Sequence, residues 1–451
     1  MGIRGTTAAE IAGSVRDQVA LGELAPQSSL PPVRTLAAEL GVNRNTVALA
    51  YRRLVEAGVA ETRGRGGTVV AVVPQLAREG VGVGGDCVDL ASGNPDPRLL
   101  PDILAAARRG DYSPPLYGMP AIDAGLEMWA CADFSEDIDQ PFRVLVTHGA
   151  VDATERLLNA HLTRGDLVAI EDPCFLASIG TLRLNGYRTA PVGVDGAGLR
   201  PDALRAALEA GARAVVCTPR AHNPTGASLT EERAADLRAV LAEHPQVLVI
   251  EDDHFAAVSA RSYHRITPPS SSRWALVRSV SKFLGPDLRL ALVAADAETA
   301  ARLEARLSAG TAWVSRLLQH ITRELLRDPR VHELHERARE LYARRSGLLV
   351  EQLHAHGVTQ NLTHVVTHGI DVPQRPDGLN VWVELDVDGR AAVAALAQRG
   401  WAVRPGHLFA PDPAAHQGAI RVTSATITEP QAEAFAAALA AVVAELRAAV
   451  N

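Results

Sequence analysis

Six short apolar runs recur between residues 143 and 293 and alternate with amphipathic segments that are rich in alanine, leucine, arginine and glutamate. The runs are Arg143–Val146, Leu167–Ile170, Ala214–Cys217, Val247–Ile250, Ala275–Val277 and Leu290–Val293. Strands that alternate with helices are typical of a sheet covered by helices. The order predicts an α/β domain with a mostly parallel sheet, whose functional loops follow the carboxyl ends of the strands.

Residues with chemical potential follow these predicted strands. Gly149 comes after the first run and opens a helix, a favourable position for an anion. Phe175 follows the second run, Asn223 follows the third within Asn-Pro-Thr-Gly, and Asp252 follows the fourth within an acidic pair. Lys282 comes after the fifth run. One crevice is therefore expected to collect an anion site, an aromatic face, an amide, a carboxylate and an amine.

Lys282 is the only lysine in the chain, and the other residues among the 45 lysines and arginines are all arginine. Arginine replaces lysine wherever a solvated charge is enough, but its guanidinium does not lose a proton and cannot form a Schiff base. Lysine can form one when its surroundings lower its pKa. Codon bias that left one accidental lysine is an equal alternative when Lys282 is considered alone, and its neighbours favour the functional interpretation.

This set of side chains matches what a pyridine aldehyde phosphate requires. The phosphate needs amide hydrogens and arginine, the ring needs a stacking partner, the ring nitrogen needs a carboxylate, and the aldehyde needs a lysine. Each motif alone has a structural explanation, since Asn-Pro-Thr-Gly is a common turn and buried acids often pair with arginine. Their combination in this order favours a cofactor site.

Size and composition indicate an ordinary globular protein. The 451 residues suffice for two or three domains, and 47% are hydrophobic. No secretory signal and no apolar run of membrane-spanning length is present, so we expect a cytoplasmic protein without a membrane partner. The four cysteines are scattered and include no CxxC pair, which predicts neither a metal site nor a disulfide framework: Cys87, Cys131, Cys174 and Cys217.

The first 70 residues have the pattern of a small DNA-binding domain. A helical period covers residues 8–21, a second short helix covers Val33–Leu40, and a third begins at Asn43 or Arg44 after a turn at Gly41. This arrangement predicts a helix-turn-helix with Asn43 as a helix cap. Residues 59–70 predict a β-hairpin wing with a glycine-rich tip. Residues 1–70 as a whole carry a net charge of +2, against −9 for the remainder of the chain.

The polar face of this domain supplies the candidate DNA contacts. Val47, Ala50 and Leu54 are expected to face the domain core, which leaves the polar residues of the third helix for bases and phosphates. The glycine-rich wing suits the minor groove or the backbone. The predicted contacts with double-stranded operator DNA are Arg34, Asn43, Arg44, Asn45, Thr46, Arg65 and Gly66.

Residues 8–70 resemble the winged-helix head of the GntR family of bacterial regulators. The resemblance rests on Leu30-Pro31-Pro32-Val33-Arg34 and on Gly41-Val42-Asn43-Arg44-Asn45-Thr46-Val47. Residues 89–445 resemble fold-type I aminotransferases, which implies a large cofactor-binding domain followed by a small C-terminal α+β domain. The domains are accordingly expected at residues 1–72 and 89–451, with a flexible linker at residues 73–88.

The second resemblance implies roles for the residues of the crevice. Lys282 would hold pyridoxal 5′-phosphate (PLP) as an internal aldimine, and Asp252 would pair with the pyridinium nitrogen. Asn223 would bond the phenolic oxygen, and Phe175 would stack on the ring. The phosphate would be held by Gly149, Ala150, Ser279, Ser281 and Arg289.

Further residues are implied at the edges of the site. Tyr117, in Leu-Tyr-Gly, would reach in from the second subunit of a homodimer, and Arg421 would clamp a substrate or effector carboxylate. His254 would contact the cofactor where the family usually has a tyrosine, and Val151 stands where a polar residue is common. Both departures put efficient transamination in doubt while leaving cofactor binding intact.

A GntR-type head joined to an aminotransferase-like body resembles the MocR subfamily of transcriptional regulators. The similarity extends to its vitamin B6 salvage branch, which controls pyridoxal kinase expression. It lies in residues 42–48, 90–97, 171–176, 220–226 and 252–255. The resemblance implies a dimeric, PLP-responsive regulator of transcription with little or no transaminase turnover. Two alternatives stay open: an active aminotransferase with an accessory head, and a regulator whose effector is an amino acid forming an external aldimine.

Overall fold

The computed structural model describes residues 2–62, 67–71, 79–80, 87–358, 364–367, 370–373, 375–412 and 414–450. The chain divides into two compact units, and the boundary between them along the N-terminal part of the chain follows residue 75. Each unit has its own hydrophobic core, as expected for domains that differ in fold.

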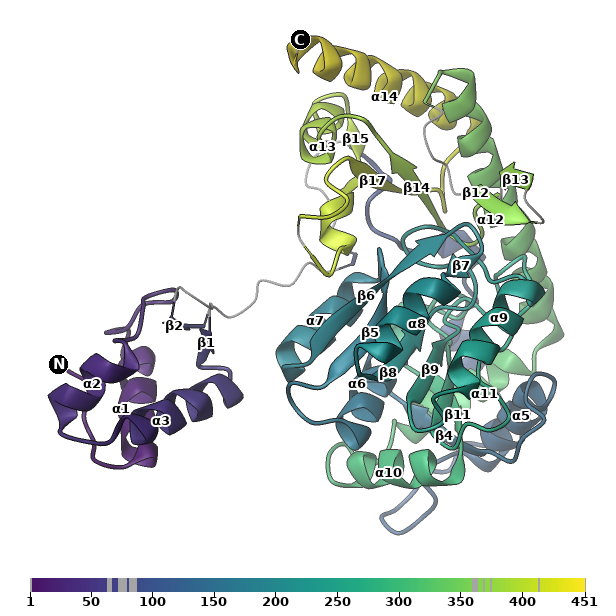
Figure 1. Cartoon of the computed structure of the whole chain (residues 1–451). Helices are drawn as coiled ribbons and strands as arrows, with labels where there is room; N and C mark the ends of the chain where they lie inside the picture. Colours follow the sequence, from purple (N-terminus) through teal and green to yellow (C-terminus); the bar gives the residue numbers. More distant parts are fainter. Residues whose placement is uncertain are drawn as a thin grey trace. The chain divides into compact units, whose positions relative to one another are not determined.

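The first unit contains three helices and a two-stranded hairpin (Figure 1). Its elements are α1 (Ala8–Ala20), α2 (Val33–Leu40), α3 (Arg44–Glu56), β1 (Ala60–Thr62) and β2 (Thr68–Val70). β1 and β2 are antiparallel. Gly41 follows α2 with a φ of 66°, a left-handed conformation that glycine adopts at little cost. The predicted order of helix, helix, turn, helix and hairpin is confirmed.

Apolar spacing explains the packing of this unit. Ile11 and Val15 of α1 are buried against α3, where Val47, Ala50 and Leu54 occupy the predicted core positions. These positions recur every three or four residues, so they lie on one face of the helix. The exposed side chains of α3 are mostly polar and include one leucine: Arg44, Asn45, Leu49, Arg52 and Arg53.

The second unit is built on an eight-stranded sheet in the order β4-β11-β10-β9-β8-β5-β6-β7 (Figure 1). Its strands are β4 (Arg143–Thr147), β5 (Leu167–Asp172), β6 (Arg188–Asp195), β7 (Gly198–Leu199), β8 (Ala212–Cys217), β9 (Leu248–Asp252), β10 (Trp274–Ser279) and β11 (Ala291–Ala295). β11 is antiparallel to both of its neighbours and β7 is antiparallel to β6, whereas the other adjacent pairs are parallel. Every predicted apolar run overlaps one of these strands, and the mostly parallel sheet is confirmed.

Helices bury both faces of this sheet. Val144 and Val146 contribute to one core cluster, whereas Leu145 between them contributes to the other, because successive side chains of a strand point to opposite faces. One face is covered by α5 (Ala124–Ser135), α8 (Pro201–Glu209), α9 (Glu231–Ala242), α11 (Arg316–Leu326) and the first half of α12 (Pro329–Ala355). The other face is covered by α6 (Ala150–His161), α7 (Leu176–Asn185) and α10 (Ala297–Ser308).

The C-terminal part adds a smaller α+β layer. β14 (Asn380–Glu384), β17 (Ala419–Thr423) and β16 (Arg404–Pro405) form an antiparallel sheet. β3 (Val88–Asp89) pairs in parallel with β15 (Trp401–Ala402), so residue 88 at the end of the predicted linker belongs to this layer. Its helices are α13 (Gly389–Ala397), α14 (Glu429–Val450) and the end of α12. The remaining elements are α4 (Ile103–Ala107), the hairpin of β12 (His364–Thr367) and β13 (Ile370–Pro373), and the short helices η2 (Pro97–Leu99), η3 (Pro286–Leu288) and η4 (Gly406–Phe409).

Candidate functional site

An anion cradle lies at the ends of three neighbouring strands. Ser279 ends β10 and pairs with Ala291 of β11, which pairs with Thr147 at the end of β4. Gly149 then caps α6 with a φ of 93°. A Cβ atom at Gly149 would lie 3.0 Å from Nη2 of Arg289, so the glycine leaves room for that guanidinium beside the helix N-terminus. An arginine at the positive end of a helix suits a phosphate.

Two serines and the first residue of α6 extend this cradle. Ser281 N donates a hydrogen bond to Ser279 Oγ at 3.3 Å, and the two hydroxyl oxygens lie 3.0 Å apart. Ala150 begins α6, where the first backbone N–H groups have no partner within the helix. The structure thus brings the residues predicted for the phosphate to adjoining strand ends: Gly149, Ala150, Ser279, Ser281 and Arg289.

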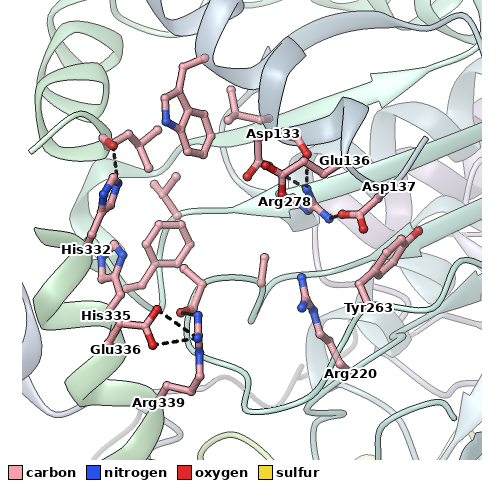
Figure 2. Close-up of a pocket in the computed structure, with 17 residues that line it drawn as sticks. Asp133, Glu136, Asp137, Arg220, Tyr263, Arg278, His332, His335, Glu336 and Arg339 are labelled. Carbon is pink, nitrogen blue, oxygen red and sulfur yellow. Dashed lines mark hydrogen bonds and ion pairs between the residues drawn. The ribbon is translucent and has the colours of Figure 1, made fainter. Parts of the chain in front are cut away.

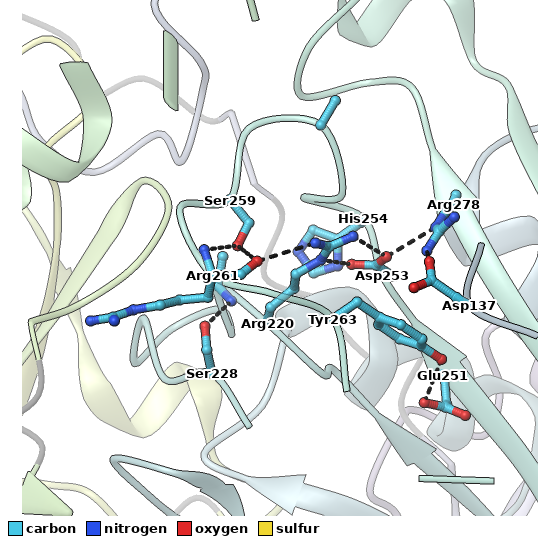
Figure 3. A network of polar contacts seen from close by, with 12 residues as sticks. Asp137, Arg220, Ser228, Glu251, Asp253, His254, Ser259, Arg261, Tyr263 and Arg278 are labelled. Atoms are coloured by element: carbon cyan, nitrogen blue, oxygen red, sulfur yellow. Dashed lines mark hydrogen bonds and ion pairs between the residues drawn. The ribbon is translucent and has the colours of Figure 1, made fainter. Parts of the chain in front are cut away.

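Three consecutive acids at the end of β9 take different roles. Glu251 accepts a hydrogen bond from Tyr263 Oη at 2.8 Å, and Asp253 accepts from Arg220 Nε and Nη2 at 2.7 and 2.8 Å (Figure 3). Side chains alternate along a strand, so Asp252 between them points away from this network. Asp252 is therefore the acid available to a ligand in the crevice.

Arg278 ties this network to the helical layer. Its Nε donates to Asp253 Oδ2 at 3.1 Å, and its guanidinium also pairs with Asp137 (Figure 3). Its Nη1 donates to Asp133 Oδ2 at 2.7 Å. Burial opposes the ionisation of Asp253, but Arg220 and Arg278 more than compensate, and the pKa of Asp253 is lowered. This buried network holds the strand end that carries Asp252.

The imidazole of His254 lies beside Asp252 and the ring of Phe175. His254 Nδ1 is 3.3 Å from Asp252 Oδ1, yet among the described residues neither buried atom has a hydrogen-bond partner of good geometry. Phe175 stacks on His254, with the ring centroids 6.3 Å apart and the planes 30° apart. Asp252 Oδ1 is thus a buried carboxylate oxygen that lacks a donor, which a protonated ring nitrogen would supply.

The amine of Lys282 is buried, and its Nζ donates a hydrogen bond to the carbonyl oxygen of Gly93 at 2.7 Å. Burial lowers the pKa of Lys282 to about 8, because the charged form loses its hydration. Glu79 raises this pKa and Arg421 lowers it. The unprotonated fraction of the amine near neutral pH is therefore far larger than for an exposed lysine, which favours its action as a nucleophile.

Arg421 lies on β17 with a side chain that is 0% exposed. Its Nη1 donates to Asn223 Oδ1 at 3.1 Å, and its Nη2 donates to Glu79 Oε2 at 3.0 Å while Nη1 contacts Glu79 Oε1. Asn223 Nδ2 donates to the same Glu79 Oε1 at 3.1 Å. Asn223, the predicted amide, and Arg421, the predicted carboxylate clamp, are thus adjacent, and the Glu79 carboxylate contacts both.

Sequence reasoning missed Glu79. It lies in a segment with glycines at positions 80, 82, 84 and 85 and without strand or helix period, so no pattern marks its side chain as part of a site. An acid within a glycine-rich segment was the only available feature, and it does not identify a partner.

These residues fit PLP. The cradle at Gly149 accommodates a phosphate only because no Cβ fills it, and Asp252 Oδ1 is a buried acceptor without a donor among the described residues. Lys282 supplies the amine for an aldehyde, and Asn223 keeps a second Nδ2 hydrogen beyond the one given to Glu79. The phosphate, ring nitrogen, phenolic oxygen and aldehyde of PLP thus each have a suitable partner among these residues.

Comparisons with known proteins place both units. Residues 7–70 match the gntR family of bacterial regulatory proteins, and residues 85–439 match class I and II aminotransferases. The chain is 44% identical to the vitamin B6 salvage pathway transcriptional repressor PtsJ of Salmonella typhimurium, over 96% of this chain and 98% of that protein. It is 25% identical to the probable rhizopine catabolism regulatory protein MocR of Rhizobium meliloti, over 76% of each chain. A multiple substrate aminotransferase from Thermococcus profundus has the same fold, with a TM-score of 0.69, 21% identity, and coverage of 81% of this chain and 93% of that one.

The chain belongs to the GntR/MocR-type regulators, which carry an aminotransferase domain. The predicted winged helix-turn-helix and fold-type I α/β domain are confirmed by these matches and by the topology of the sheet. Within the described part of this regulator, none of the helices is long and apolar enough to cross a membrane.

In the head of this GntR/MocR-type regulator, the predicted DNA contacts lie at the start of α3 and on α2. Arg34, Arg44 and Asn45 are exposed, and Thr46 is partly exposed. Asn43 caps α3, because its side-chain oxygen accepts a hydrogen bond from Asn45 N at 2.9 Å. The other two candidates, Arg65 and Gly66, lie outside the described residues.

Tyr117 is not part of the crevice of its own chain. Its side chain is 90% exposed and packs edge-on against Trp313, with 5.4 Å between the ring centroids. The neighbouring Leu116 and Met119 are also exposed. The predicted role of Tyr117 therefore depends on a second subunit.

A separate cavity of about 390 Å³ is lined by none of the predicted cofactor residues (Figure 2). Its arginines are already matched by acids: Arg278 pairs with Asp133 and Asp137, and Arg339 pairs with Glu336 (Figure 2). The cavity thus adjoins the ionic network that supports β9.

Proposed function

We propose that this regulator binds operator DNA as a homodimer and changes its affinity for that DNA when PLP occupies the Lys282 site. The observation that carries the proposal is the buried amine of Lys282 in one crevice with Asn223 and Arg421, in a chain that also has a DNA-binding head. An amine with a lowered pKa is what an aldehyde needs, and sensing it through a covalent bond gives selectivity for that aldehyde.

The residues of the crevice divide the recognition of the cofactor among them. When bound, PLP would supply the aldehyde for which Lys282 provides the amine. Arg289 and the α6 N-terminus would hold the phosphate, Asp252 would keep the ring nitrogen protonated, and Asn223 would bond the phenolic oxygen. Phe175 covers the ring face. His254 would contact the cofactor at the position where the enzymes usually have a tyrosine.

The genes under control are proposed to be those of vitamin B6 salvage. The support is the 44% identity to the Salmonella typhimurium repressor PtsJ, which extends over nearly the whole of both chains. A salvage pathway makes PLP, so a regulator that binds PLP would measure the product of the genes it controls. Such a protein would act in the cytoplasm, where its DNA lies.

Dimerisation would place Tyr117 of one subunit in the cofactor site of the other. The exposed apolar side chains of Leu116, Tyr117 and Met119, which are close in sequence, support this arrangement, because exposed apolar patches mark interfaces. We retain the domain limits of 1–72 and 89–451 and the linker at residues 73–88 as part of the proposal.

The test uses the full-length protein with and without PLP. Purified protein should absorb as a Schiff base and lose this absorbance on borohydride reduction. Peptide mapping should then find the reduced cofactor attached to Lys282. Footprinting on its own upstream region should then show a change in affinity with PLP; a coupling of about 1–3 kcal/mol corresponds to about 5–150-fold. Operator DNA must change PLP affinity by the same factor. Lys282→Ala should lose both the absorbance and the coupling.

The buried Arg421 favours a second candidate, an active aminotransferase, because a carboxylate clamp serves an amino-acid substrate. The same residue would serve an amino-acid effector. Turnover of amino and keto acids above about one per second would favour the enzyme. Identical operator binding by the cofactor-free and cofactor-loaded protein would exclude the sensor.

A further inference from the structure

The carboxylate clamp already holds a carboxylate that belongs to the chain. Arg421 and Glu79 form a two-point ion pair, and Asn223 Nδ2 donates to the same carboxylate. The Arg421 guanidinium is fully buried, and a buried cation without a counter-ion is strongly unfavourable. Glu79 supplies that counter-ion from within the same compact unit.

This pairing uses the terminal donors of Arg421. Its Nη1 contacts Glu79 and Asn223 Oδ1, and its Nη2 contacts Glu79 and the carbonyl oxygen of Ala91. Each terminal nitrogen has two hydrogens, so all four are in use. A ligand carboxylate could form the same two-point contact only if Glu79 left.

The backbone beside Glu79 is fitted to this position. Gly80 N donates a hydrogen bond to the carbonyl oxygen of Ser92 at 2.9 Å. Gly93 has a φ of 65°, and a Cβ there would lie 2.7 Å from Glu79 Oε2. Gly93 also accepts the hydrogen bond from Lys282 Nζ, so Glu79, Gly93 and the reactive amine form one continuous set of contacts.

We infer that Glu79 is an internal ligand of Arg421 that stands in for the α-carboxylate of an amino acid and so restricts the site to the cofactor. An amino acid enters with its carboxylate on Arg421 only by displacing Glu79. This inference rests on the proposed function and decides between its two effectors: PLP has an aldehyde and a phosphate but no carboxylate, so it does not compete for the clamp. Glu79 and Arg421 also both lie close enough to Lys282 to affect its pKa, which Glu79 raises and Arg421 lowers.

Displacement of Glu79 also has a consequence for the head. Glu79 lies in the proposed linker of residues 73–88, and its ion pair and the Gly80 hydrogen bond hold residues 79 and 80 on the body. A carboxylate ligand would therefore release these two residues, whereas PLP alone would leave them attached. The clamp thus becomes the point at which an amino acid would act on the head.

The test compares full-length wild type, Glu79→Gln and the matched control Glu209→Gln, whose side chain is exposed at the end of α8. The probes are L-alanine and ethylamine, which share the amine and differ in the carboxylate. Two quantities are measured: the probe concentration that half-perturbs the cofactor absorbance, and hydrogen exchange of a peptide that contains Gly80. Hydrogen exchange of the Gly80 peptide is also measured in the cofactor-free protein.

In wild type and Glu209→Gln, L-alanine should perturb the cofactor at about the same concentration as ethylamine. In Glu79→Gln, the value for L-alanine should fall relative to that for ethylamine by about 10-fold or more, since a charge-assisted carboxylate contact becomes available. Any effect of the substitution on Lys282 itself is common to both probes and cancels in this ratio. Exchange at Gly80 should rise in Glu79→Gln. It should rise in wild type only when L-alanine reaches concentrations that displace Glu79.

Equal responses to the two probes in Glu79→Gln, or Gly80 exchange unchanged by the substitution, would overturn the inference. Failure of every variant to take up PLP would instead overturn the proposed function. In that case the exchange of Gly80 in the cofactor-free protein still decides whether Glu79 holds the linker on Arg421.

Discussion

Arg289 Nη2 lies 3.0 Å from the point where a side chain at Gly149 would begin. Gly149 also has φ 93° and ψ 170°, a region that is nearly restricted to glycine. Gly149→Ala should therefore push the guanidinium out of the cradle, and the strain should cost about 1–3 kcal/mol. We expect PLP affinity to fall by roughly 10-fold or more, since a charge-assisted phosphate contact is weakened. Titration of the cofactor absorbance measures this change.

Gly165→Ala is the matched control for this prediction. Gly165 has a φ of 89°, close to that of Gly149, but a Cβ there would meet nothing within 4 Å. Its substitution should lower stability through backbone strain and leave PLP affinity unchanged. Equal loss of PLP affinity in the two variants would show that strain, rather than the contact with Arg289, is responsible.

The network beneath Asp252 predicts a large effect at Asp253. Asp253→Asn removes the charge that balances Arg220 and part of the charge that balances Arg278, both of which are mostly buried. Breaking a buried ion pair on one side costs about 3–5 kcal/mol. The midpoint of urea unfolding should shift accordingly. Because the folded-state pKa of Asp253 is lowered, its stabilising effect is present above the unfolded pKa and is lost as the pH falls through the folded value.

Asp202→Asn provides the contrast. Asp202 pairs with Arg200 at 2.6 Å, but about half or more of each side chain is exposed, at 66% and 52%. Exposed pairs contribute about 0–1 kcal/mol, so this variant should unfold close to wild type. A comparable loss of stability in both variants would contradict the role assigned to the buried network.

Six strands of the large sheet were predictable because apolar runs bounded by polar turns are local patterns, and each predicted run overlaps an observed strand, whereas β6 and β7 of the same sheet were not predicted. The candidate cofactor residues could be selected from the sequence because they follow predicted strands, and parallel strands end at the same edge of a sheet. The contact of Glu79 with Arg421 was not predictable, since the two lie 342 positions apart and residue 79 has no periodic context. Glu251, Asp252 and Asp253 are equivalent as acids in the composition. Side chains alternate along β9, so Asp252 points to the opposite side from Glu251 and Asp253.

The cap of α3 separates structural from DNA-binding roles in the head. Asn43 Oδ1 accepts from Asn45 N at 2.9 Å, so Asn43→Ala should destabilise the head by about 0.5–2 kcal/mol, and Asn43→Ser should restore most of it. Operator affinity measured by anisotropy should recover with serine if Asn43 acts through the cap. Loss of affinity in both variants would assign Asn43 a base contact.

Arg44 offers the complementary test, because its exposed side chain is not needed for the cap. Arg44→Ala should weaken operator binding by about 1–3 kcal/mol and relax specificity at one position. Arg16→Ala, on the exposed face of α1, is the control and should retain specificity. Equal operator affinity in Arg44→Ala and wild type would count against α3 as the reading helix.

The final prediction concerns the pH dependence of PLP uptake by the cofactor-free protein. Only the unprotonated amine of Lys282 reacts, and burial lowers its pKa to about 8, so uptake should accelerate as the pH rises through that value. Glu79 stabilises the protonated amine and Arg421 destabilises it. Glu79→Gln should therefore move the midpoint to lower pH, and Arg421→Gln should move it to higher pH.

Stopped-flow measurement of the cofactor absorbance across the neutral and mildly alkaline range gives both midpoints. The ionisation of free PLP is common to all variants and cancels in the comparison. Glu209→Gln, which removes a carboxylate far from Lys282 in sequence and exposed at the end of α8, should keep the wild-type midpoint. Opposite shifts are required, because a negative and a positive neighbour change the proton affinity of the same amine in opposite directions. Shifts of the same sign in Glu79→Gln and Arg421→Gln would mean that the substitutions act by opening the crevice to water, and the charge relationship among the three residues would be wrong.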